Sequence, residues 1–119
     1  MGIVDVFRRK PKNLDEFVEV AKKRHWEEIA VTMRVVSGKK KGVAVLRSGG
    51  HVEHWLDFAG MNSRGRGIVY REKLFDRDDG GFSDVEGRRS ARAEHSRLAD
   101  GKARELKTKL PSVFVRVIK

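Results

Sequence analysis

The chain has 119 residues, no cysteine, and a formal net charge of +10 that comes from 27 Lys and Arg against 17 Asp and Glu. This length suits one domain, and the lack of cysteine excludes disulfides and thiolate metal sites, so a cytoplasmic location is the expectation. No apolar run reaches the length of a membrane span. The excess of positive charge favours an anionic partner, with solubility alone as the simpler explanation.

The sequence predicts an N-terminal arm over residues 1–12 and a single α+β domain over residues 13–119. The arm contains the apolar stretch Ile3–Phe7, which we expect to dock on the domain or on a second copy of the chain. A helix is predicted directly after the arm, because Asn13 is a suitable N-cap and Glu16 has the spacing of a capping box. The apolar stripe at helical period consists of Leu14, Phe17, Val18, Ala21 and Ile29.

Two short runs rich in β-branched residues, 31–36 and 42–46, come next and predict a hairpin. Three consecutive lysines, Lys39, Lys40 and Lys41, would lie at the tip of this hairpin. Because like charges repel one another, such a tip predicts either an anionic partner or simple screening by solvent.

Residues 52–58 alternate in a way that predicts a half-buried strand, with a short helix as the competing interpretation. Residues 59–67 predict a flexible loop that carries Arg64 and Arg66 among glycines, and residues 68–75 predict the returning strand. The side chains on one side of the first strand are Val52, His54, Leu56 and Phe58.

A long polar helix is predicted over residues 83–110, and Gly101 could divide it, because glycine inside a helix costs about 1 kcal/mol relative to alanine. Pro111 ends the helix, and residues 112–118 predict a last strand. The predicted fold is therefore α+β in the order α-β-β-β-β-α-β, an antiparallel four- to five-stranded meander with the helices packed on one face. The last strand, which follows a helix, could join in parallel or at an edge.

The leading functional hypothesis is a small, basic, non-catalytic domain that binds the backbone of DNA or RNA. In it, the lysine-rich hairpin and the Arg/Gly loop contact phosphates, and a tryptophan stacks on a base. For Trp26, an alternative is that the ring covers a neighbouring loop or lies at a subunit contact. The residues assigned to this interface are Lys39, Lys40, Lys41, Arg34, Arg47, Arg64, Arg66, Arg71, Trp26 and Trp55.

The rival hypothesis is a protein-interaction or small-ligand-binding domain, as a homodimer, whose positive charge is incidental. Its contacts would come from Ile3–Phe7 or from an edge strand over Val113–Ile118.

Enzymatic alternatives are weaker, and no cofactor or metal is expected. The segment His51–His54 lacks the i, i+4 histidine pair of a zinc hydrolase. A restriction-type nuclease site needs Glu-x-Lys on one strand, whereas Glu72 and Lys73 are adjacent and would point to opposite faces. A metal-independent ribonuclease could draw on a His or Glu base and an arginine. The residues of those types are His54, Glu53, Arg71 and His95, and their spacing does not show that they converge.

Overall fold

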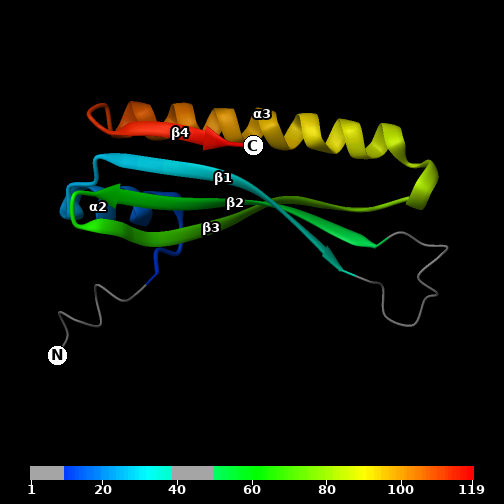
Figure 1. Cartoon of the computed structure of the whole chain (residues 1–119), viewed down its shortest axis with the longest axis horizontal. Coiled ribbons are helices and arrows are strands. Elements are labelled where there is room, and N and C mark those ends of the chain that lie inside the picture. Colours follow the sequence, from blue (N-terminus) through cyan, green and yellow to red (C-terminus); the bar gives the residue numbers. More distant parts are fainter. Residues whose placement is uncertain (1–9, 39–49) are drawn as a thin grey trace.

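The computed structural model of the chain describes residues 10–38 and 50–119. Two helices and a four-stranded sheet make up this part of the chain (Figure 1). The elements are α2 (Leu14–Arg24), β1 (Glu28–Gly38), β2 (His51–Asn62), β3 (Gly65–Asp78), a 3-10 turn η1 (Gly81–Ser83), α3 (Val85–Lys109) and β4 (Phe114–Ile118). The α+β class of the fold is confirmed.

The sheet is mixed, with the strand order β3-β2-β1-β4. Strands β1, β2 and β3 form an antiparallel meander, whereas β4 pairs in parallel with β1 at the edge of the sheet. The predicted antiparallel meander is confirmed for β1, β2 and β3, but the sheet as a whole is mixed, because the last strand joins in parallel at an edge, an alternative that the sequence left open. A strand that returns after a helix can run parallel to the strand it joins, because the helix carries the chain back along the sheet.

β1 pairs along its whole length with β2, with Val36 opposite Glu53. Residues 42–46, the predicted hairpin partner of residues 31–36, lie outside the described part of the chain, so that hairpin stays a prediction. The order seen in the described residues is α-β-β-β-α-β.

Both helices pack on the same face of the sheet, as predicted. From α2, the Phe17 ring lies 5.7 Å from that of Phe58. From α3, the His95 ring lies 4.9 Å from that of His54, measured between ring centroids. His54 and Phe58 are four residues apart on β2 and so point to one side. We call this the helix face and the opposite side the open face.

The start of α2 follows from its first residues. The side chain of Asn13 accepts a hydrogen bond from the Glu16 N–H at 2.9 Å, which satisfies one free donor of the first turn. The Glu16 carboxylate in turn accepts from the N–H of Lys12 at 2.6 Å rather than from that of Asn13. The predicted stripe is confirmed for Leu14, Phe17, Val18 and Ala21, which are buried, whereas Ile29 is a core residue of β1.

α3 is continuous through Gly101. Its buried side chains are alanines except for one histidine and one leucine, so the helix can approach the sheet closely. They are Ala91, His95, Ala99, Ala103 and Leu106. His95 is the unexpected member of this stripe, because it is a histidine with no exposed surface.

The predicted loop over residues 59–67 is mostly strand. β2 continues to Asn62 and β3 begins at Gly65, so only Ser63 and Arg64 form the turn between them. Glycine is needed inside these strands because the Trp26 indole lies on them: a Cβ at Gly60 or at Gly67 would overlap the ring. Glycines in a strand can mark a close approach of another group as well as a loop.

Candidate functional site

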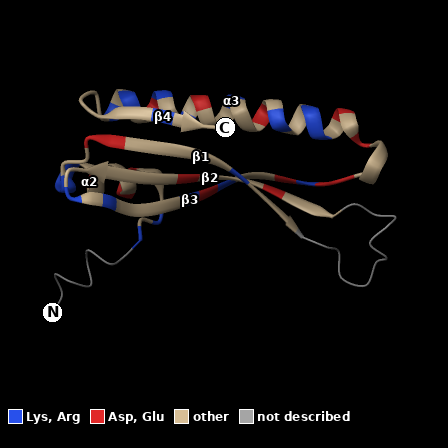
Figure 2. Ribbon diagram, viewed as in Figure 1, with Lys and Arg blue, Asp and Glu red and all other residues tan. Residues whose placement is uncertain are grey.

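Lys and Arg residues of α2, of the β2–β3 turn and of β3 come together at the end of the molecule where β2 turns into β3 (Figure 2). A groove of about 520 Å³ lies there between the carboxyl end of α2 and the β2–β3 turn. Lys23 and Arg24 line it from α2, and Arg64 and Arg66 line it from the turn and the start of β3. We call these four residues the basic end.

Three cations of the basic end, Lys23, Arg64 and Arg66, are not matched by carboxylates among the described residues. Among the residues that line the groove, Glu27 alone is acidic. Lys23, Arg64 and Arg66 are exposed, and none of the three forms an ion pair with another residue of the described ranges. Unpaired guanidinium and ammonium groups in one groove attract an anion, because each keeps its donors free.

Asn62 holds the two sides of the groove together. Its side-chain Nδ2 donates a hydrogen bond to the backbone carbonyl oxygen of Arg24 at 2.9 Å. Its side-chain Oδ1 accepts one from the backbone N–H of Arg64 at 2.8 Å. The end of α2 and the turn therefore have a fixed relative position. Gly65 has φ of 122°, a conformation that side-chain-bearing residues rarely adopt, and it completes the tight turn.

Trp26 does not serve as a stacking platform. Only 4% of its surface is exposed, because its ring is covered between α2 and the glycines of β2 and β3. This burial argues against the base-stacking role predicted for Trp26. The ring covers neighbouring segments, as in one alternative, but these are the strands β2 and β3 rather than a loop. Trp55 lies half-buried on the open face, where its indole N–H donates to Glu53 at 3.1 Å.

Arg34 and Arg71 are brought together on the open face, but around a carboxylate. Their side chains lie 3.7 Å and 3.4 Å from opposite oxygens of Asp57, which stands between them on β2. The pairing makes both guanidinium groups less available to phosphate than the exposed cations of the basic end.

Lys39, Lys40, Lys41 and Arg47 lie outside the described residues. The flanking residues Gly38 and His51 pair at one end of β2, and the Arg64 turn follows the other end. β2 has 12 residues, so its ends are roughly 35 Å apart at about 3.3 Å per residue. Gly38 and the Arg64 turn therefore do not border one compact site.

A second cluster on the open face has the donor types of a metal site. The His51 ring nitrogens lie 3.8 Å from a Glu53 oxygen, 3.5 Å from an Asp76 oxygen and 3.6 Å from an Asp78 oxygen. However, the Lys73 ammonium already lies 3.2 Å from Asp76 and 3.9 Å from Glu53. The carboxylates thus have an internal cation, and the cluster is explained by cross-strand ion pairing.

The residues proposed for a ribonuclease converge only in part. His54 and His95 meet on the helix face, whereas Glu53 and Arg71 lie on the open face. The nuclease argument from Glu72 and Lys73 is confirmed: Glu72 pairs with Lys102 of α3 at 3.2 Å, and Lys73 pairs on the open face.

No family model, curated protein or solved structure matches this chain. Within the described residues, neither helix is long and apolar enough to cross a membrane.

Proposed function

We propose that the protein binds nucleic acid, and that the basic end makes the principal phosphate contacts. The observation that carries this proposal is the gathering of Lys23, Arg64 and Arg66 around one groove without ion-pair partners in the described ranges. On the open face of the sheet, two other arginines that the sequence assigned to the interface, Arg34 and Arg71, already form ion pairs with Asp57.

Phosphate is the anion that this arrangement suits. Arginine offers paired N–H donors in a planar fork that matches two phosphate oxygens, and lysine adds a point charge. Trp26 is the one Trp, Tyr or Phe among the residues that line the groove, and its ring is covered, so the exposed His25 is left as the aromatic side chain there. The contacts would be largely independent of sequence, as is usual when the backbone supplies most of the affinity.

The direct test is to map amide chemical shifts while a short single-stranded RNA and a DNA duplex are added in turn. We expect the largest changes at Lys23, Arg24 and residues 63–67, with smaller changes along the open face. Changes confined to β4, or no changes with either nucleic acid, would overturn the proposal.

A homodimer is a second candidate function, and the exposed side chains of β4 favour it. β4 is an edge strand whose Phe114 and Ile118 are 62% and 41% exposed, on the same side as Arg116. Unpaired backbone groups and two apolar side chains on an edge suit pairing with a second copy. The arm residues Ile3–Phe7 lie outside the described part of the chain.

Light scattering tests this candidate. It predicts the mass of two chains at high protein concentration, and the mass of one chain after Phe114→Lys together with Ile118→Lys. A wild-type protein that remains a single chain would exclude it.

A further inference from the structure

A second cleft lies on the helix face, at the opposite half of the sheet from the basic end. β4 pairs with β1 only as far as Thr32 and Ile118, and α2 packs on the other half of the sheet. Beyond that pair, the first turns of α3 lie over the helix face of the sheet. The space between them is a cleft of about 390 Å³, in the size range of small-molecule sites.

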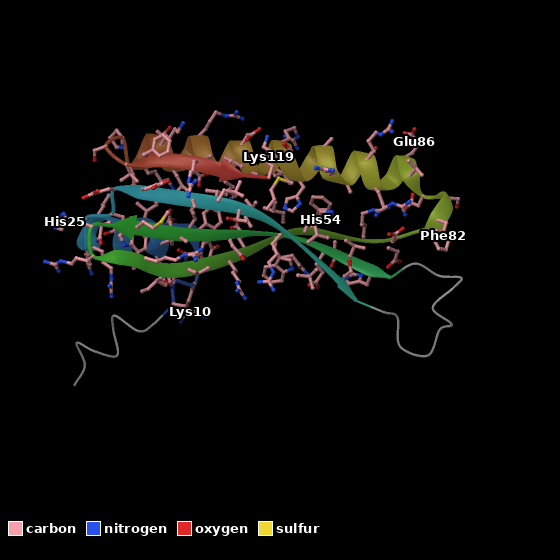
Figure 3. All side chains as sticks on the ribbon, in the orientation of Figure 1. Lys10, His25, His54, Phe82, Glu86 and Lys119 are labelled. Atoms are coloured by element: carbon pink, nitrogen blue, oxygen red, sulfur yellow. The ribbon has the colours of Figure 1, made fainter. Side chains whose placement is uncertain are left out.

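Two buried histidines form part of the wall of this cleft. His54 of β2, labelled in Figure 3, is 5% exposed. His95 of α3 is fully buried, and the two rings meet edge to face. His54 also stacks on Phe75, with the ring planes only 13° apart. These contacts hold the two imidazoles in fixed positions.

The histidines are not satisfied by the protein. His95 donates its Nε2–H to the carbonyl oxygen of Trp55 at 2.8 Å, since a carbonyl can only accept. The Nδ1 atoms of His54 and His95 are both buried without a hydrogen-bond partner among the described residues. A buried polar atom without a partner costs about 1–3 kcal/mol, so this pair calls for a ligand or water that completes it.

The charged side chains that line the cleft indicate the charge of the ligand that would bind there. Four cations, Arg77, Arg88, Arg92 and Lys119, line it together with one carboxylate, Asp79. Arg88 pairs with Asp79 at 3.1 Å, Lys119 pairs with Asp100 at 3.1 Å, and Arg77 pairs with Asp84. Arg92 has no partner in the described ranges and is exposed at the mouth of the cleft. A metal cation is disfavoured by these neighbours, and an anion is favoured.

We propose that this cleft binds a small phosphate monoester, with the phosphate at Arg92 and His54 and the apolar part of the ligand against Met33 and Val35. Met33 and Val35 line the side of the cleft formed by β1, and more than half of the Val35 surface is exposed. The inference is independent of the proposed binding of nucleic acid, because the two sites share no residue.

Protonation of His54 would then be coupled to binding. Burial, followed by the charges of His95 and Arg77, lowers the pKa of His54, so the ring is neutral at neutral pH. Besides Arg77, the charged groups that line the same cleft are Arg88, Arg92, Asp79 and Lys119. A bound phosphate would add negative charge beside the ring and raise the pKa of His54, so binding would be linked to the uptake of a proton by that ring. Protonation of the phosphate itself, whose second pKa is about 6, acts in the opposite direction on affinity.

The test compares adenosine 5′-monophosphate, inorganic phosphate and adenosine, each titrated into the full chain while the His54 and His95 ring resonances are followed. We expect the monophosphate to shift both rings and to bind more tightly than inorganic phosphate, and adenosine to leave them unchanged. Equal effects of monophosphate and adenosine would overturn the proposal. So would shifts from the monophosphate that are confined to the basic end.

A matched pair of variants locates the site. Arg92→Gln should weaken monophosphate binding about tenfold, the usual scale for one charge-assisted hydrogen bond. Arg104→Gln removes the same charge from an exposed position of the same helix outside the cleft, and should leave the affinity unchanged. Equal losses in both variants would show a general charge effect and would contradict the proposal. Unchanged thermal midpoints would verify that both variants are folded.

Discussion

The indole of Trp26 occupies the space that a Cβ at Gly60 would need. Trp26 follows α2 and Gly60 lies in β2, so this contact joins the helix to the sheet. The Trp26 ring also lies 5.2 Å from that of Phe17, measured between centroids, in the centre of the core. The glycines of β2 and β3 are therefore part of the packing beneath the basic end.

Substitution of Gly60 tests this packing. Gly60→Ala should lower the free energy of unfolding by about 1–3 kcal/mol, because the added methyl group must displace the ring in a well-packed core. Gly101→Ala is the matched control: nothing lies near its Cβ position in α3, and alanine should stabilise the helix by about 0.5–1 kcal/mol. Urea denaturation measures both. A Gly60→Ala protein as stable as the wild type would contradict this account of the contact.

The two tryptophans should differ in their importance for stability. Trp26→Ala removes a covered ring from the core and should cost about 3–5 kcal/mol. Trp55→Phe loses one hydrogen bond to Glu53 at a half-buried position and should cost about 1 kcal/mol. Equal losses in the two variants would show that Trp26 is not the core residue described above.

Stability should fall as the solution is acidified below the ordinary pKa of histidine. The folded pKa of His54 is lowered by burial and by His95 and Arg77, so below about pH 6.5 the unfolded chain takes up a proton that the folded chain does not. The loss begins near pH 6.5 and ends at the lowered folded pKa; above pH 6.5 both states are neutral and His54 contributes nothing.

His54→Gln should remove the loss of stability below about pH 6.5 that comes from protonation of His54 in the unfolded chain. Midpoints of urea denaturation between about pH 5 and 8 measure this difference. His25→Asn is the control, because His25 is exposed and its φ of 53° is one that asparagine tolerates. Identical pH dependence in His54→Gln and wild type would contradict the assignment.

Asp57→Asn should strengthen the binding of an oligonucleotide at low salt, because it leaves Arg34 and Arg71 without their shared carboxylate. The cost in stability should be at most about 1 kcal/mol, since both arginines are largely exposed. Glu105→Gln on α3 changes the net charge equally, away from the open face. Anisotropy titrations that show the same gain for both variants would remove any role of Arg34 and Arg71.

Local features of the fold were predictable from the sequence. The Asn13 cap, the apolar stripe of α2 and the alternation of β2 depend on neighbours within four residues, and the structure confirms each of them. The length of the β2–β3 turn was not predictable, because the glycines that suggested a loop are required by Trp26, more than 30 residues earlier in the sequence.

The arrangement of the candidate sites depended on register and on long-range packing. The residues next to Asp57 in the sequence do not show that Arg34 and Arg71 lie beside it. Each of these two ion pairs depends on how β1, β2 and β3 are aligned in the sheet. His54 and His95 meet only because the fold places α3 on the helix face of the sheet, about 40 residues later in the chain than β2. A histidine on the small-residue stripe of α3 was the one available indication, since His95 is four residues from both Ala91 and Ala99.

The salt dependence of nucleic-acid binding tests the central claim most directly. The logarithm of the association constant should fall linearly with the logarithm of salt concentration, with a slope of about 0.7 for each phosphate contact on a single strand. Replacing Lys23, Arg64 and Arg66 with alanine should reduce the slope by about two. Replacing Arg89, Arg104 and Lys107, which are exposed on α3, should change it by less than one. Equal reductions in the two triple variants, or wild-type binding that does not respond to salt, would contradict the account.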